Sequence, residues 1–351
     1  MDISHALQDQ IRSAVAERRP LRIHGSGSKD FYGRPVEGET LAVAGHRDIV
    51  NYQAAELILT ARCGTPLEEL EQCLAAQGQM LPFEPPRFGP GATLGGAVAC
   101  GLSGPRRPYA GALRDFILGA RCINGRGEIL RFGGEVVKNV AGFDAARLMA
   151  GALGTLGVLL DISLKILPRP AAELTLAFEM EAAAAIGALN RWAARPLPLS
   201  AGSHGDGLLR LRLSGAPAAL EAAHTRLGGE VLSNGADYWR SLREHELDFF
   251  RDDRPLWRIS LPPAAPPLPI VGDWHLEWGG AQRWLKTALR PAIVRATTTR
   301  AGGHATLFRN GAGHGAVFHP LAPALLEIHK RLKAAFDPHR ILNPGRLYPE
   351  V

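Results

Sequence analysis

The 351-residue sequence has few cysteines and no apolar run of transmembrane length. The four cysteines, at positions 63, 73, 100 and 122, form no Cys-x-x-Cys pair and no metal-ligand spacing. This pattern argues against a metal site, an iron-sulfur cluster or a disulfide framework within the chain. The first residues lack the charged and apolar blocks of a signal peptide, so we expect a cytoplasmic chain with no direct membrane insertion.

Lysine is also scarce, and only six of the 40 lysine and arginine residues are lysines. The net charge of +6 is spread along the chain, without a basic block of five or more residues, which favours a solvated surface over a nucleic-acid-binding one. The excess positive charge suits an anionic ligand or an acidic partner subunit. The length and the 46% apolar content predict a full hydrophobic core divided between two domains.

The most informative stretch contains Lys138 and Asn139 and then a series of glycines. Asp144 is suited to begin a short helix, Gly154 to take a left-handed conformation after it, and residues 158–167 to form an apolar strand. A dinucleotide-binding Rossmann unit has the reverse order, strand then glycines then helix. The stretch therefore predicts a fold other than the Rossmann fold, in which the glycine backbone lies close to a flat ligand.

Two further glycine-rich loops lie upstream. Residues 24–30 follow a short apolar strand at residues 21–23, and their glycines, serines and lysine suit a backbone nest for phosphate oxygens, although a simple glycine turn is the alternative. The loop has neither the third glycine of G-x-G-x-x-G nor Walker A spacing, which disfavours nicotinamide and nucleoside-triphosphate sites. The second loop, residues 89–96, is followed by small residues that permit a ligand to lie against the main chain.

Strand and helix patterns alternate through the rest of the chain. Thr65 and Pro66 are typical of an N-cap and first position of a helix. Residues 117–123 and 128–132 indicate a β-hairpin, and the strand and helix patterns between residues 171 and 320 predict a separate α+β domain.

The order of these pieces resembles the FAD-binding domain of the vanillyl-alcohol oxidase and p-cresol methylhydroxylase family. The matching segments are residues 22–29, 92–96, 114–115, 154–158 and the C-terminal 336–347. The resemblance implies an α+β fold with a two-subdomain FAD-binding domain of the p-cresol methylhydroxylase type at residues 1–170. A smaller α+β cap domain at 171–320 and a C-terminal segment at 321–351 that returns to the first domain would complete it.

Residues 278–284 and 302–309 extend the resemblance to one subgroup, the smaller FAD-binding subunits, or E subunits, of bacterial glycolate oxidases. Members of that family work with a larger flavoprotein subunit and an iron-sulfur subunit to oxidise glycolate to glyoxylate. The resemblance therefore implies an FAD-dependent oxidoreductase subunit that passes electrons to its partners. The complex would be cytoplasmic, with any membrane association through those partners.

The resemblance also implies which residues hold FAD. The first loop and the second loop would bind the diphosphate, the glycine turn before residue 158 the adenine or ribose end, and the C-terminal segment the isoalloxazine or diphosphate. The residues are Gly25, Ser26, Gly27, Ser28, Lys29, Thr93, Gly95, Gly96, Asp115, Lys138, Asn139, Gly157, Val158, Asn343 and Arg346. Because Ser28 stands where family members with covalent flavin have a histidine, we expect noncovalent FAD.

Oxidation of a small 2-hydroxy acid needs a base for the hydroxyl proton and a cation for the carboxylate. His304 and Arg309 are the candidates, but the complete histidine and glutamate motifs of the larger subunit are missing. We therefore expect substrate oxidation mainly in the partner. A self-sufficient FAD-dependent 2-hydroxy-acid dehydrogenase and a non-catalytic flavin-bearing structural subunit are the alternatives.

Overall fold

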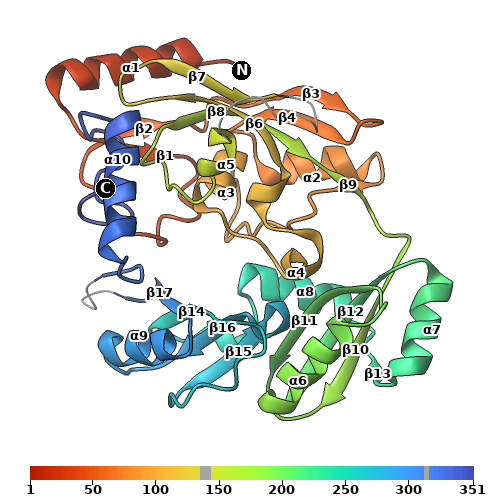
Figure 1. The fold of residues 1–351 in the computed structure, drawn as a ribbon. Helices are drawn as coiled ribbons and strands as arrows, with labels where there is room; N and C mark the ends of the chain where they lie inside the picture. Colours follow the sequence, from red (N-terminus) through yellow and green to blue (C-terminus); the bar gives the residue numbers. More distant parts are fainter. Residues whose placement is uncertain (135–143, 312–315) are drawn as a thin grey trace. The chain divides into compact units, whose positions relative to one another are not determined.

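The computed structural model describes residues 1–134, 144–311 and 316–351, and the chain divides into two compact units. Unit 1 combines residues 1–102, 112–168 and 320–351, and unit 2 combines residues 103–111 and 169–319. In Figure 1 the blue helix α10 (Pro323–Phe336) therefore belongs with the red and orange N-terminal elements. Helices and strands are mixed in both units, which confirms the predicted α+β class.

Unit 1 contains a five-stranded antiparallel sheet in the order β3-β4-β8-β6-β7 and a separate parallel pair, β1-β2. A short ribbon pairs β5 with β9. Besides α10, its elements are α1 (Ser4–Glu17), β1 (Leu21–His24), β2 (Glu39–Ala42), β3 (Ile49–Gln53), β4 (Ile58–Arg62), α2 (Leu67–Ala75), β5 (Gln79–Met80), α3 (Leu94–Cys100), the 3-10 helix η1 (Leu113–Phe116), β6 (Ile117–Ile123), β7 (Ile129–Gly133), α5 (Ala145–Leu148), β8 (Val158–Lys165) and β9 (Leu167–Pro168).

One core cluster explains why the two ends of the chain meet in unit 1. Leu7 and Ile11 of α1 are fully buried against residues from β1, β2, β6 and β8, and against Ile341 and Leu342 of the C-terminal segment. Leu342 also forms a parallel bridge with Leu21, so the C-terminal segment extends the β1-β2 pair. Burying these apolar side chains drives the association of segments more than 300 residues apart.

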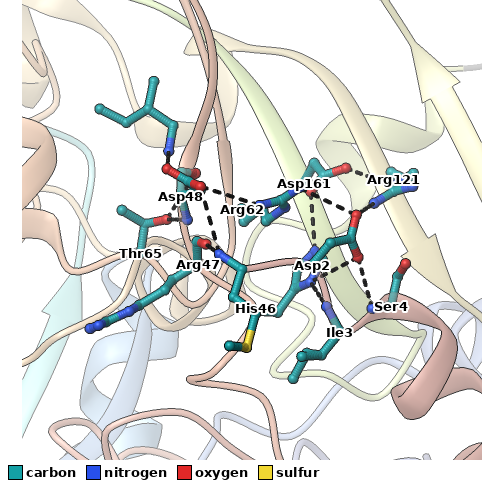
Figure 2. A network of polar contacts seen from close by, with 12 residues as sticks. Asp2, Ile3, Ser4, His46, Arg47, Asp48, Arg62, Thr65, Arg121 and Asp161 are labelled. Atoms are coloured by element: carbon teal, nitrogen blue, oxygen red, sulfur yellow. Dashed lines mark hydrogen bonds and ion pairs between the residues drawn. The ribbon is translucent and has the colours of Figure 1, made fainter.

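The start of α1 is held by the polar network in Figure 2, centred on buried His46. The Ile3 N–H donates to His46 Nδ1 at 3.2 Å, so that nitrogen must accept, and Nε2 donates to Asp161 at 3.2 Å. Arg121 Nε pairs with Asp161 at 2.6 Å. A backbone hydrogen bond from Ser4 is the main cause that lowers the pKa of Asp2 to about 2. The network fixes α1 to β6 and β8.

Unit 2 is built on an eight-stranded antiparallel sheet in the order β13-β10-β12-β11-β15-β16-β14-β17. Its elements are α4 (Arg107–Ala110), β10 (Ala172–Glu179), α6 (Ala182–Ala193), β11 (Leu199–Gly205), β12 (Leu208–Gly215), α7 (Pro217–Leu227), β13 (Glu230–Val231), α8 (Gly235–Glu244), η2 (Asp248–Phe250), β14 (Leu256–Ser260), β15 (Asp273–Glu277), η3 (Trp278–Gly280), β16 (Gln282–Lys286), α9 (Pro291–Arg300) and β17 (His304–Arg309).

The two faces of this sheet differ in chemistry. On one face, α6 and α7 cover leucines of β12, and α9 covers a second apolar cluster around Trp257 and Leu285. The other face carries polar side chains that are nevertheless buried, including Arg212, His275 and Glu277. The alternation follows from the two-residue period of a β-strand.

The segment Ser103–Gly111 belongs to unit 2 although its neighbours in sequence belong to unit 1. Trp278 Nε1 donates to the Gly104 carbonyl at 3.1 Å, and the Arg107 guanidinium lies 4.3 Å from the Trp278 ring centroid. Arg106 forms an ion pair with Glu173. These contacts attach the segment to β10 and η3.

Candidate functional site

A cavity of about 820 Å³, counting its open mouth, lies within unit 1. Its walls come from β1 and the following loop, the end of β4, the start of α3, the turn before β8 and the C-terminal segment. The lining residues are Arg22, Ile23, Gly25, Ser26, Gly27, Ser28, Lys29, Asp30, Val36, Val43, Cys63, Thr93, Gly95, Gly96, Ala99, Cys100, Leu153, Gly154, Gly157, Val158, Leu159, Asn343 and Arg346.

The first two glycine-rich loops face each other across part of this cavity. A Cβ atom added at Gly25 would lie 3.1 Å from Thr93 Oγ1, and one added at Gly91 would lie 3.8 Å from the Ser26 Cβ. Thr93 also caps α3, because its hydroxyl accepts a hydrogen bond of 3.1 Å from the Gly96 N–H. The approach is therefore tight at Gly25, where a Cβ atom would press on the Thr93 hydroxyl, whereas a Cβ atom at Gly91 would make only an ordinary contact.

The start of α3 is pressed onto the end of β4. The Gly95 N–H donates to the Cys63 carbonyl at 2.7 Å, and a Cβ atom at Gly95 would lie 2.8 Å from the Cys63 Cβ. No side chain fits there without displacing β4. Gly95 consequently lets the helix N-terminus form one wall of the cavity.

Asn343 joins three segments of the cavity wall. Its Oδ1 accepts from the Ile23 N–H at 2.8 Å, and its Nδ2 donates to the Leu153 carbonyl at 2.7 Å. Gly154 has φ +75°, and a Cβ atom on it would lie 2.7 Å from Asn343 Nδ2. The left-handed glycine thus leaves room for the amide that ties β1 to the glycine turn.

The cavity is positively charged. Among the residues that the structure describes, three cations, Arg22, Lys29 and Arg346, and one carboxylate, Asp30, line it. Arg22 pairs with Asp30 at 2.6 Å, whereas Arg346 donates to backbone carbonyls, including that of Tyr32 at 2.7 Å. Lys29 is buried and donates to the Arg87 carbonyl at 3.1 Å. The net positive charge suits an anionic ligand.

Two thiols also line the cavity. Burial raises the pKa of Cys100 to about 11 and raises the pKa of Cys63 well above its usual value. Both groups are therefore thiols at neutral pH and weak nucleophiles.

The structure brings together most of the predicted FAD-binding residues. The cavity contains Gly25, Ser26, Gly27, Ser28, Lys29, Thr93, Gly95, Gly96, Gly157, Val158, Asn343 and Arg346. Asp115 does not line it, since its carboxylate accepts from the Ala112 N–H at 2.9 Å within η1. Lys138 and Asn139 lie outside the described residues.

Sequence reasoning missed several lining residues. Among them are Asp30, Cys63, Cys100 and Gly154. Asp30 is the last residue of the first loop, and Cys63 directly follows the buried strand β4. Membership of the loop and the position after the strand are the signals that could have found them. Gly154 lies in the matching segment 154–158, but it is not among the individual residues that the resemblance assigns to FAD.

His304 and Arg309 lie in unit 2, at opposite ends of β17. Their partners on β14 are Ser260 and Leu256, four residues apart, which corresponds to about 13 Å along a strand. Burial and then Arg258 lower the pKa of His304, and burial lowers the pKa of Arg309. The two side chains have different neighbours, and the structure does not bring them together as one constellation.

Two family models match the chain. The model of an FAD binding domain matches residues 4–133, and the model of the C-terminal domain of FAD linked oxidases matches residues 319–347. Both matched stretches contribute to unit 1 and to the cavity described above.

The comparison with curated proteins finds a full-length relative. Glycolate oxidase subunit GlcE of Escherichia coli strain K12 is 49% identical over 350 residues, which cover 100% of this chain and 99% of that protein. Glycolate oxidase subunit GlcD of Bacillus subtilis strain 168 is 30% identical over 170 residues, 48% of this chain and 36% of that protein.

Solved structures share the fold at low sequence identity. p-Cresol methylhydroxylase with substrate bound matches with a TM-score of 0.70 and 14% identity, covering 99% of this chain and 87% of that one. An alkyldihydroxyacetonephosphate synthase matches with a TM-score of 0.67 and 16% identity, covering 98% of this chain and 76% of that one. These similarities confirm the predicted p-cresol methylhydroxylase type of fold.

Proposed function

Because this chain belongs to the family of glycolate oxidase subunits GlcE, we propose that it is the FAD-binding subunit of a complex that oxidises glycolate to glyoxylate. It is an FAD-dependent oxidoreductase subunit, and its cofactor is FAD. The observation that supports the cofactor's place is the cavity in unit 1, where three separated glycine-rich segments and Asn343 meet. We place residues 1–170 and 321–351 in the FAD-binding domain and residues 171–320 in the cap domain.

The residues of the cavity fit FAD. Lys29 and Arg346 would face the anionic diphosphate, which backbone N–H groups of the two glycine-rich loops would also bind. The glycine turn at Gly157 and Val158 would lie against the adenine or ribose end. When bound, the isoalloxazine supplies the hydride-accepting chemistry of the reaction. We also propose that Asp115, Lys138 and Asn139 contribute to FAD binding.

We infer that FAD is held noncovalently. Of the described residues that line the cavity, none is a histidine or tyrosine, and burial keeps the thiols of Cys63 and Cys100 protonated. Acid precipitation of the purified chain should therefore release all flavin into the supernatant. Flavin that stays with the precipitate would contradict this inference.

We place the oxidation of glycolate mainly in a partner flavoprotein, with electrons passing to an iron-sulfur subunit. The subunit names of the relatives support a multi-subunit glycolate oxidase, and the cysteine spacing of this chain supports a cluster on another chain. We further infer a cytoplasmic complex whose membrane association, where it occurs, runs through the partners. Among residues 1–134, 144–311 and 316–351, no helix is both long and apolar enough to span a bilayer.

Anaerobic titration with glycolate tests this division of labour. We expect the isolated, FAD-loaded chain to keep its oxidised-flavin absorbance, and the complex with the larger flavoprotein to lose it. Rapid bleaching of the isolated chain would instead establish a self-sufficient dehydrogenase. A complex that is unaffected by loss of this chain's flavin would establish the structural-subunit alternative.

The self-sufficient alternative has one supporting observation. The lowered pKa of His304 keeps its imidazole neutral near pH 7, as a general base requires. If the isolated chain oxidises glycolate, His304→Ala should abolish bleaching and Arg309→Met should raise the glycolate concentration that it needs. Unchanged bleaching in both variants would remove these residues from the proposal.

A further inference from the structure

Lys333 is a charged side chain buried inside unit 1, away from the cavity lining. It is the only residue of α10 that is buried, with 0% of the residue exposed. Burial lowers the pKa of this lysine, and Asp337 opposes that shift. A buried ammonium is costly unless all its N–H groups have acceptors.

Three acceptors satisfy this ammonium. Lys333 Nζ donates to the Thr155 carbonyl at 2.8 Å and to the Leu342 carbonyl at 2.7 Å, and it pairs with Asp337 Oδ2 at 2.9 Å. An ammonium has three N–H donors, so this set saturates it. One cation therefore connects three separate segments of the chain.

Asp337, the carboxylate partner of Lys333, has hydrogen-bond donors of its own. It is fully buried, and its carboxylate accepts from the Ile341 N–H at 3.2 Å and the Leu342 N–H at 2.8 Å. A Cβ atom on Gly125 would lie 2.1 Å from Asp337 Oδ1, so the β6-β7 turn closes over the carboxylate. The pair thus fixes the backbone of residues 341–342.

Both carbonyls that Lys333 holds are next to the cavity wall. Thr155 follows Gly154 in the glycine turn, and Leu342 precedes Asn343, whose amide bridges Ile23 and Leu153. The ammonium, which does not itself line the cavity, therefore acts together with the Asn343 amide to hold the turn and the C-terminal segment at a fixed distance.

We propose that Lys333 is a positioning residue of the flavin site, which holds the glycine turn and Asn343 at the separation that FAD requires. The proposal rests on the FAD-binding role proposed above. A purely structural role would predict lost stability without a specific loss of FAD affinity.

The test measures the FAD dissociation constant and the unfolding midpoint of the full chain. Lys333→Met removes the ammonium, and Lys333→Met/Asp337→Asn also removes the carboxylate, which avoids an unpaired buried charge. Leu74→Ala is the control, because Leu74 is fully buried in α2 of the same unit and does not line the cavity. We expect both Lys333 variants to weaken FAD binding by about tenfold or more, and Leu74→Ala to change it by less than about twofold.

A double-mutant cycle with Asn343→Ala tests whether Lys333 affects FAD binding through Asn343. If Lys333 acts through Asn343, Lys333→Met should weaken FAD binding much less in the Asn343→Ala background than in the parent. Parent-like FAD affinity in the charge-free double variant, or fully additive losses in the cycle, would overturn the proposal. A folded parent chain that binds no FAD would instead refute the proposed function.

Discussion

At the residue scale, the glycines were the best-predicted part of the site. Gly154 was expected to be left-handed and has φ +75°, and Asp144 caps α5 as expected, accepting from the Arg147 N–H at 3.3 Å. Such features depend on local conformation, which the sequence pattern encodes directly.

Thr65 shows the opposite case. It was predicted to cap α2, but Pro66 is at the N-cap position and no side chain caps that helix. The Thr65 hydroxyl instead donates to the Asp48 carbonyl at 3.1 Å and accepts from the Asp48 N–H at 2.9 Å. The competing partner is 17 residues away, and nothing in the neighbouring sequence indicates it.

Gly154→Ala should damage both the fold and the cofactor site. The left-handed conformation costs a non-glycine residue about 1–2 kcal/mol, and the new methyl group would displace the Asn343 amide. We expect a lower free energy of unfolding and FAD binding weakened by about tenfold or more, measured by urea titration and flavin titration.

Gly45→Ala is the matched control for this substitution. Its new Cβ atom would lie 3.4 Å from Ile3 Cδ1, an ordinary contact, and Gly45 does not line the cavity. Parent-like FAD affinity is expected. An equal loss in both variants would disprove the role of Gly154.

At the scale of elements, short-range structure was predicted and sheet order was not. The hairpin of β6 and β7 follows from its alternation and its turn, where Asn124 Oδ1 accepts from the Arg126 and Glu128 N–H groups. The order of the eight-stranded sheet places β17 beside β14, across two intervening strands in sequence. Such pairing depends on tertiary packing that periodicity does not report.

The N-terminus of α3 provides an element-scale prediction. Thr93→Ala removes the oxygen that accepts the Gly96 N–H, so the free energy of unfolding should fall by about 1 kcal/mol and FAD affinity should fall with it. Thr93→Ser keeps the hydroxyl and should retain most of both. Thermal unfolding and flavin titration measure the two effects, and indistinguishable alanine and serine variants would contradict the prediction.

The polar face of the sheet in unit 2 should make its stability depend on pH. Burial lowers the pKa of His275 on β15 from 6.5 to about 3. The unfolded chain takes up a proton below about pH 6.5, whereas the folded chain does not, so stability is complete above that pH and is lost as pH falls. Between these two pKa values, this group lowers the free energy of unfolding by about 1.4 kcal/mol for each pH unit that the pH falls.

His275→Gln removes this titration. Urea unfolding of the parent at pH 7 and pH 4.5, followed by tryptophan fluorescence, should show a larger loss of stability than the same measurement on the variant. Equal losses would mean that His275 is accessible to protons in the folded state.

At the scale of the whole molecule, sequence resemblance located the fold, but local patterns gave no sign that residues 103–111 join unit 2. Their attachment depends on Trp278 and Glu173, both more than 60 residues away. All six tryptophans lie between positions 192 and 284, within unit 2, whereas the proposed FAD cavity lies within unit 1. The two units therefore have separate spectroscopic reporters.

FAD should stabilise the two units unequally. At a free FAD concentration 100 times the dissociation constant, the free energy of unfolding of the unit that binds it rises by about 2.7 kcal/mol. We expect the transition seen by flavin fluorescence to move to higher urea and the transition seen by tryptophan fluorescence to stay in place. A common shift of both transitions would show that the units unfold together.

The hydrogen bond between Ile23 and Asn343 spans 320 residues of sequence, and it has a consequence for biosynthesis. Domains fold from the N-terminus as the ribosome releases the chain. Unit 2 can complete its sheet while the C-terminal segment is still being made, but the cavity lacks a wall until Asn343 emerges. Nascent chains arrested before that residue should fail to retain flavin, so cofactor loading would follow the translation of both units' sheets and of residue 343.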